Sequence, residues 1–442
     1  MLSKEDVIKN YVKMSLNVIR TYDWLLDLYV LDFFQDDHWS KLPLAWRQSF
    51  DNIDPTTLGN VLCGQPVNII LPLSFLALKK AVDLLSIPRK QSISKKHITY
   101  VPDYSIGNHP RLKNLFLKHV KLKKRHEISL MAEIVKDVAD QTKCKAVLDF
   151  GSGVGHLVRM LAYRYELHAA GLECQSQLTE EARKLDLELE YTIRKHITDE
   201  HMKKLHKPEH LNVKLTCHQQ LTHIELPETL GTYGLVGLHP CGDLGPLLLK
   251  HFVSDDKVKF ICMVGCCFMK LTDHGYPLSK YTKKLNSELS YPSREIACHA
   301  IEVYCDRLKK GNYEDLKIHA YRAALERILV DIDPKLKHAP VRSIKHSDTM
   351  NFERYCHLAM ERLNVPLPTK TEVWLRGQTD VQMWRRVVTV YSLRLVLAPL
   401  VETVVLLDRL LFILEHGISC EIRPVFDPKI SPRNHVMIAR KQ

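Results

Sequence analysis

A glycine-rich turn is the part of this 442-residue chain best suited to ligand chemistry. The pattern D-x-G-x-G-x-G runs from Asp149 through Gly151, Gly153 and Gly155, between an apolar run and a helical stretch. Glycines let the backbone approach a ligand closely, and the following helix start offers N–H groups without helical partners. The turn therefore predicts a binding loop, to which Ser152 also belongs.

A second carboxylate fits the same ligand. Glu173 ends the next apolar run, 18 residues after Gly155, and the usual offset between such strands is about 20 residues. A carboxylate there accepts hydrogen bonds from ribose hydroxyls, in nicotinamide and S-adenosylmethionine sites alike. The dinucleotide fingerprint G-x-G-x-x-G is not met, because His156 stands where its third glycine would be. The alternative is a tight turn with a helix-capping acid.

Possible reactive groups follow two later apolar runs. His239 ends the first run and Cys241 and Asp243 come directly after it, and Cys266 and Cys267 come directly after the second. Ligands of open α/β sheets bind beyond the carboxyl ends of the strands, so these residues are expected near the glycine turn. His239 or Asp243 would serve as a base that frees an acceptor lone pair, and Cys241 as a thiol. These three are the predicted catalytic residues.

Simpler roles compete with these. His239 would otherwise be a satisfied core histidine, and Cys266 and Cys267 inert buried thiols. Zinc ligation by the histidine and the three cysteines is conceivable, but their spacing matches no standard structural zinc site. No metal site is therefore predicted.

Alternating strands and helices must position these groups. Apolar runs at 145–149, 167–173, 234–239 and 258–264 predict strands separated by helices, which implies parallel pairing. A helix at 395–415 and two strands at 420–426 and 435–440 end the chain as a hairpin whose last strand is antiparallel. The predicted fold is α/β, with a Rossmann-like sheet, a helical N-terminal region and a helical insertion before the last helix and terminal hairpin.

The predicted domains follow from this pattern. A helical N-terminal region with a linker from Ser92 to Pro110 makes up residues 1–110, and the Rossmann-like core 111–270. A mostly helical insertion makes up 271–386, and the last helix with the terminal strand pair 387–442. The apolar stretch 387–414 carries four charges and Pro399, which favours a buried helix over a membrane span.

The composition of the chain indicates which kinds of binding partner and which cellular location are favoured. With 63 basic and 51 acidic residues the formal charge is +12, which favours an anionic partner such as RNA. The basic run 118–126 would bind phosphates or form a solvated helix face. The acidic N-terminus does not fit a signal peptide, and the mostly isolated cysteines indicate free thiols. An intracellular location, cytoplasmic or nuclear, is expected, with no membrane partner, and the sequence leaves protein partners unknown.

Several segments together resemble the methyltransferase-like protein 25 family, most closely its B-type members, also called ribosomal RNA adenine dimethylase domain-containing proteins. The segments are 123–127, 148–157, 237–244, 264–267, 401–409 and 431–436. The resemblance covers residues 100–442 best. It implies a class I methyltransferase fold and S-adenosylmethionine as cofactor, with Asp149 near its ammonium group and His239, Cys241 and Asp243 facing the acceptor.

The acceptor is less determined. The segment from His239 to Asp243, with the Cys266-Cys267 pair, is also similar to transfer-RNA ribose 2′-O-methyltransferases, whose zinc-binding segments are not found here. Together with the charge, this favours RNA. The adenine-N6 signature is absent, and the cysteine layout only loosely resembles RNA cytosine-C5 methyltransferases. A protein acceptor and a cofactor-binding scaffold without turnover are the alternatives.

Overall fold

The computed structural model describes residues 3–90, 120–214, 231–311, 313–342, 344, 350–361, 363, 365 and 371–441. The predicted linker at 92–110 lies outside these residues. The chain divides into two compact units: Met1–Lys13, Pro88–Glu288 and Val404–Gln442 form the first, and Met14–Ile87 with Leu289–Thr403 form the second. The boundaries of these units differ from those of the predicted domains, because most of the N-terminal helices and most of the insertion belong to the same unit.

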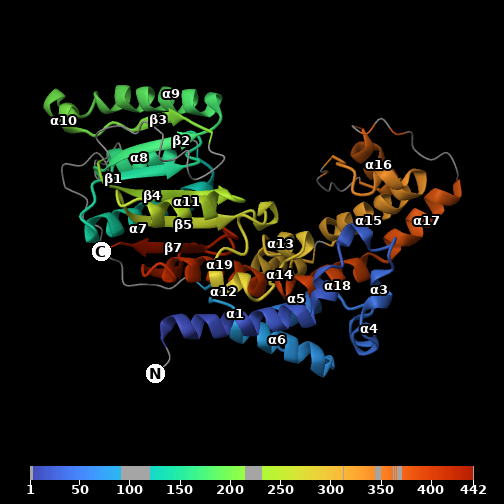
Figure 1. Ribbon diagram of the computed structural model, residues 1–442. Helices are drawn as coiled ribbons and strands as arrows, with labels where there is room; N and C mark the ends of the chain where they lie inside the picture. Colours follow the sequence, from blue (N-terminus) through green and yellow to red (C-terminus); the bar gives the residue numbers. More distant parts are fainter. Residues whose placement is uncertain are drawn as a thin grey trace. The chain divides into compact units, whose positions relative to one another are not determined.

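The first unit is built around a single seven-stranded sheet (Figure 1). Its strands are β1 (Ala146–Phe150), β2 (His168–Glu173), β3 (Glu209–Asn212), β4 (Tyr233–Cys241), β5 (Val258–Cys266), β6 (Ser419–Pro424) and β7 (His435–Arg440). The strand order is β3-β2-β1-β4-β5-β7-β6; β1 to β5 run parallel, and β7 is antiparallel to β5 and β6. This confirms the predicted fold class, including the terminal hairpin.

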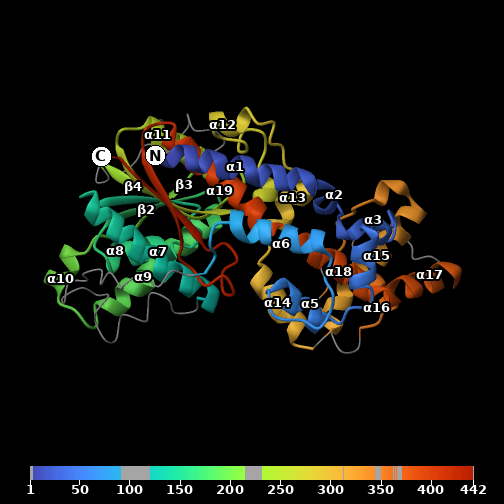
Figure 2. The same ribbon diagram turned by 90° about the horizontal axis from the view of Figure 1, so that it is seen from below.

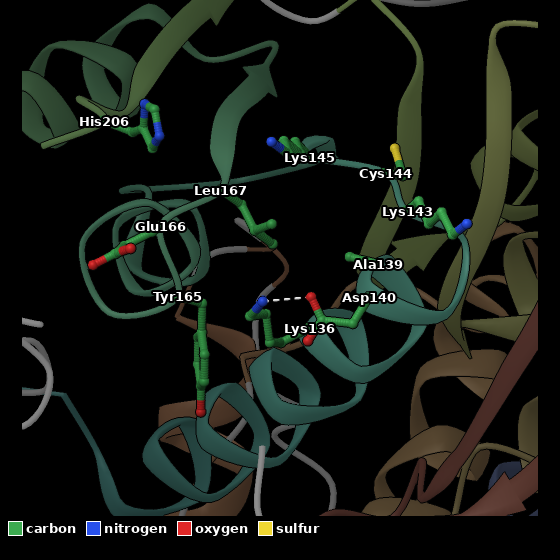
Figure 3. A pocket seen from close by; sticks show the side chains of 10 residues that line it. All are labelled: Lys136, Ala139, Asp140, Lys143, Cys144, Lys145, Tyr165, Glu166, Leu167 and His206. Carbon is green, nitrogen blue, oxygen red and sulfur yellow. Dashed lines mark hydrogen bonds and ion pairs between the residues drawn. The ribbon is translucent and has the colours of Figure 1, made fainter. Parts of the chain in front are cut away.

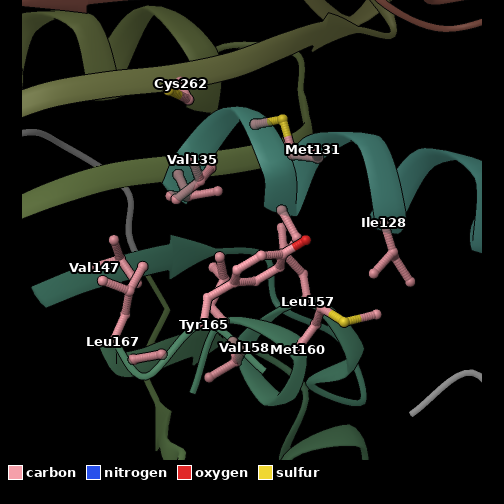
Figure 4. Close-up of a cluster of buried hydrophobic side chains, with 14 of the residues drawn as sticks. Ile128, Met131, Val135, Val147, Leu157, Val158, Met160, Tyr165, Leu167 and Cys262 are labelled. Carbon is pink, nitrogen blue, oxygen red and sulfur yellow. The ribbon is translucent and has the colours of Figure 1, made fainter. Parts of the chain in front are cut away.

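Helices cover both faces of this sheet. The helices of this unit are α7 (Leu122–Gln141), α8 (His156–Tyr163), α9 (Ser176–Ile193), α10 (Asp199–Lys204), α11 (Leu244–Ser254) and α12 (Lys280–Lys283), together with parts of α1 (Lys4–Thr21) and α19 (Ala398–Leu414). Helices α7 and α8 lie on one face, and α11 and α19 on the other (Figure 2). Alternate strand residues such as Val147 and Cys262 join the core with residues of α7 and α8 (Figure 4). Val236 belongs to the same core. Period-two alternation thus fixes which strand residues face each layer.

The described part of the second unit contains helices and no strand. Its helices are α2 (Asp23–Leu26), α3 (His38–Lys41), α4 (Leu44–Phe50), α5 (Pro55–Leu62), α6 (Leu73–Leu85), α13 (Tyr291–Ile296), α14 (Ile301–Lys309), α15 (Glu314–Ile332), α16 (Phe352–Met360), α17 (Thr371–Gln382) and α18 (Trp384–Leu395), and α1 (Lys4–Thr21) enters it. Helices α5 and α14 pack together although about 240 residues separate them. The helical N-terminal region and the helical insertion are thereby confirmed.

The apolar stretch near the C-terminus forms two helices instead of one. Helix α18 ends at Leu395 and α19 begins at Ala398, one residue before Pro399. Proline fits the first turn of a helix, where no partner for its missing N–H is needed, so the break falls just before it. Within the described ranges, no helix is both long and apolar enough to cross a membrane.

Candidate active site

The glycine turn leaves open space on one side. Gly151 and Gly153 have φ angles of 72° and 56°, in the left-handed region, and a Cβ added at either would meet no atom within 4 Å. The turn is held by N–H groups of Gly151 and Ser152, which donate to the Leu172 carbonyl at 2.9 and 3.1 Å. The open side is therefore bare backbone, as a ligand cradle requires.

Glu173 reaches from the end of β2 to this turn. Its Oε2 accepts a hydrogen bond from the Gly153 N–H at 3.0 Å, and its Oε1 accepts from the Gln175 N–H at 3.0 Å. The structure thus brings together the two motifs that the sequence predicts as one site. The carboxylate that should bind ribose hydroxyls faces the bare backbone opposite it.

Asp149 is the buried acid of the site. It is 3% exposed, and its Oδ1 has no hydrogen-bond partner among the described residues. Burial raises the pKa of Asp149 to about 7; nearby Lys124 opposes this shift and Glu173 adds to it. A buried carboxyl oxygen without a donor is unfavourable, so the position suits a ligand that brings a cation or an N–H group.

Two other loop residues pack inward. The Ser152 side chain lies against Gly171 of β2, and a Cβ at Gly155 would clash with the His210 ring. That ring is itself fixed, since His210 Nε2 lies 2.7 Å from Asp186 Oδ2 and Arg159 Nε donates to the other carboxylate oxygen. Gly155 therefore permits close packing of the turn, while Gly151 and Gly153 provide the open surface.

His239 lies in a buried network at the end of β4. Its Nε2 is 2.9 Å from Glu127 Oε1, and the Ser431 hydroxyl donates to the same oxygen at 2.6 Å. Burial alone would raise the pKa of Glu127, but the hydrogen bonds from His239 and Ser431 and the charge of Lys123 lower it to about 2. Because Glu127 is a carboxylate, His239 must carry its proton on Nε2. Its Nδ1 has no partner among the described residues.

Asp243, by contrast, is held by its neighbours. Its Oδ1 accepts from the Thr272 N–H at 2.9 Å and its Oδ2 from the Thr272 hydroxyl. Both oxygens thus anchor the loop that follows β5. The arrangement favours His239 over Asp243 as the base.

The three cysteines of this edge converge. Cys241 Sγ lies 3.2 Å from Cys267 Sγ, which is 3.3 Å from Cys266 Sγ. Cys241 is exposed and the other two are half-buried, so they do not fit the inert buried thiol alternative. Hydrogen bonds with Cys266 and Cys267 lower the pKa of Cys241 to about 5 although burial alone would raise it, and the charge of Lys270 also lowers it.

A separate pocket lies at the opposite end of β1. Its volume is about 520 Å³, and its lining includes Lys143, Lys145, Glu166 and His206 (Figure 3). The residues Lys143 to Lys145 precede β1, whereas the glycine turn follows it. Ligands of parallel sheets bind at the carboxyl ends of strands, so this pocket is not the predicted site.

Some residues of the site are not evident from sequence. Glu127 and Ser431 stand far from His239 in the chain, and Arg159 and Asp186, which support the turn, carry no motif. Glu127 borders the basic run, and both Glu127 and Ser431 lie in segments that carry the family resemblance, but neither signal indicates their contact with His239.

Comparison with known proteins gives the family context. Residues 123–274 match a family described as "Methyltransferase domain". The chain is 29% identical over 226 residues to "Probable methyltransferase-like protein 25" of Mus musculus, and 30% identical over 227 residues to that of Homo sapiens. Each alignment covers 47% of this chain and 37% of the relative, so the chain spans little more than a third of the relatives' length.

Among solved structures, the plantazolicin methyltransferase BamL, in complex with a triazolic desmethylPZN analog and SAH, is 12% identical. The match covers 63% of this chain and 86% of that chain, with a TM-score of 0.23. The strand order β3-β2-β1-β4-β5-β7-β6 itself defines the fold. Residues 123–274 are thus similar to a methyltransferase domain, and about half of this chain is similar to part of the methyltransferase-like protein 25 proteins.

Proposed function

We propose that this chain is an S-adenosylmethionine-dependent methyltransferase and that RNA is its acceptor. The observation that carries the cofactor assignment is the unpartnered buried oxygen of Asp149 beside the open backbone of Gly151 and Gly153. Bound S-adenosylmethionine supplies an electrophilic methyl group on a sulfonium centre. The methyltransferase family match supports this cofactor.

The residues present fit such a ligand. Asp149 would receive the ammonium group, and the bare turn would admit the amino-acid part without a clash. Glu173 accepts a hydrogen bond from the Gly153 N–H, so its carboxylate lies at the turn, where it would accept hydrogen bonds from the ribose hydroxyls. An anion facing a cationic ligand at a turn of this kind provides both orientation and affinity.

His239 would remove the acceptor proton. Glu127 fixes the imidazole with its proton on Nε2, so the lone pair lies on Nδ1, which is buried and has no partner among the described residues. A hydroxyl or amine acceptor would have to displace the groups that cover Nδ1 to reach it. Glu127 therefore acts as a positioning residue. The Cys241 thiol lies at the end of the same strand, and Asp243 holds the loop after β5.

RNA is favoured as the acceptor by the charge beside this site. The chain carries a formal charge of +12. Exposed Lys121 caps the start of α7, and exposed Lys123 lies one turn before buried Glu127. Lys123 Nζ is 3.8 Å from Glu127 Oε1, so basic side chains border the network around His239. Such a cluster would bind phosphates. The mostly isolated cysteines, which indicate free thiols, support an intracellular site of action, cytoplasmic or nuclear.

Loss of the base is expected to slow transfer without affecting the cofactor. His239→Ala should lower the methyl-transfer rate about 100-fold, within the usual range for one acid–base residue, and Glu127→Gln about tenfold. Single-turnover rates and calorimetric affinities measured on the same preparations separate the two effects. Equal methyl-transfer rates in His239→Ala and the unmodified chain would show that His239 is not the base.

The acceptor class can be determined directly. The purified chain is incubated with methyl-labelled S-adenosylmethionine and cell extract, and portions are treated with RNase or with protease. Label lost on RNase treatment supports the proposal. Label lost only on protease treatment indicates a protein acceptor, and no label above that of Gly153→Arg indicates a scaffold without turnover.

A further inference from the structure

We propose that Cys241, Cys266 and Cys267 form a binding site for one Zn²⁺ ion, with three thiolate ligands and one open coordination position. The proposal rests on the convergence of the three sulfurs and is independent of the proposed methyl transfer. Among the described residues, these side chains can each offer one sulfur, and the three sulfurs lie within 4.8 Å of one another.

Two irregularities of the sheet produce this convergence. Leu238 pairs with Val264, but the next pair is Cys241 with Cys266, so two residues of β4 oppose one residue of β5. This bulge places Cys241 directly beside Cys266. Bulges of this kind are typical next to functional sites, where they redirect a side chain.

The second irregularity is at Cys267. Successive residues of a strand point to opposite faces, so adjacent cysteines should diverge. Cys267 instead has a φ angle of 50°, in the left-handed region that non-glycine residues rarely adopt. As a result its sulfur turns back to within 3.3 Å of Cys266 Sγ. Strain of this type persists where the surrounding structure requires it, often at functional sites.

The geometry and chemistry of the cluster suit zinc. Zn–S bonds are about 2.3 Å long, so sulfurs at tetrahedral angles lie about 3.8 Å apart. The observed separations of 3.2 and 3.3 Å need only small side-chain rotations to reach this value. Soft thiolates select zinc and Cu(I) over hard cations, and three protein ligands with an open position are typical of reactive zinc sites.

Arg409 on α19 supports a negatively charged complex. Its side chain is fully buried, and none of its guanidinium nitrogens has a hydrogen-bond partner among the described residues. One of them, Nη1, lies 2.6 Å from where a Cβ of Gly265 would stand, next to Cys266 in the chain. The two carboxylates whose charges act on it, Asp408 and Asp243, accept hydrogen bonds from other groups. Three thiolates around Zn²⁺ carry a net charge of −1 and would add a counter-charge beside this buried cation.

Metal content tests the proposal on the full-length chain, without cofactor or acceptor. Protein purified under reducing conditions should retain about one zinc per chain by mass spectrometry of the ion, and Co²⁺ should give a thiolate-to-cobalt charge-transfer band. Changing any one of the three cysteines to serine should weaken Co²⁺ binding by at least about 10- to 100-fold, since even outer-shell changes have effects of this size. Cys63→Ser, at an exposed cysteine of the second unit, is the matched control and should bind as the unmodified chain does.

Cys267→Gly is a second test that should stay folded even if a serine variant does not. Glycine adopts the left-handed backbone of this position easily, and it removes the sulfur. A folded Cys267→Gly that loses Co²⁺ binding supports the site. Undiminished binding in the three serine variants would overturn it, as would a Cys241–Cys267 disulfide in protein isolated under reducing conditions. Because these measurements need no methyl transfer, their failure would leave the proposed function untouched.

Discussion

Gly153→Arg is expected to abolish S-adenosylmethionine binding, with an affinity loss of at least about 100-fold, or about 2.7 kcal/mol. Nothing lies within 4 Å of a Cβ at this position, so the new side chain would project into the open side of the turn. The left-handed backbone would add about 1 to 2 kcal/mol of local strain, which a domain with this core should tolerate. Calorimetric titration with S-adenosylmethionine measures the loss.

Gly417→Arg is a matched control for the strain. Gly417 has a φ angle of 73°, and a Cβ there also meets nothing within 4 Å, but it follows α19, away from the glycine turn. We expect both variants to lose similar stability, and only Gly153→Arg to lose affinity. Unchanged affinity in Gly153→Arg would disprove the placement of the cofactor.

Asp149→Asn is expected to stabilise the methyltransferase domain above neutral pH while it weakens cofactor binding. Burial raises the Asp149 pKa from 3.8 to about 7, and about 1.4 kcal/mol per pKa unit makes its ionised form cost about 4 kcal/mol. The native state therefore binds a proton that the unfolded chain releases. The stability from this group is fully present below pH 3.8 and is lost as the pH rises through about 7.

The advantage of Asp149→Asn should accordingly grow between pH 4 and pH 7 and reach about 4 kcal/mol, roughly a thousandfold in the folding equilibrium. Hydrogen exchange of the β1 amides measures the stability of the first unit directly. Tryptophan fluorescence would not, because all five tryptophans (Trp24, Trp39, Trp46, Trp374 and Trp384) lie in the second unit. Asp256→Asn, at an exposed position, should show no such trend. A pH-independent difference would show that Asp149 titrates normally.

The sequence predicts the parts of the site whose residues are close in the chain. Gly153 and Glu173 belong to one strand–turn–helix–strand unit, so their contact follows from motif spacing. The fold class follows from alternating apolar runs and helical periodicity for the same reason. Strand β3, by contrast, has only four residues, Glu209 to Asn212, and their polar character gives no strand signal.

Other parts depend on contacts across long separations. Glu127 and Ser431 meet at His239 from positions 112 residues before it and nearly 200 residues after it. No local pattern encodes that meeting. The convergence of Cys241 with Cys267 requires a bulge and a left-handed residue, which residue types alone do not reveal. Sequence spacing therefore predicted no metal site there.

The position of the antiparallel strand β7 in the chain determines when the sheet can be completed during translation. It borders β5, which ends at Cys266, but β7 itself begins only at His435. At about 5 to 20 residues per second, roughly 10 to 30 s of translation pass before the partner strand is available. Until then β5 has a free edge rich in apolar residues, a template for aggregation. We expect the nascent chain to depend on chaperones during this interval.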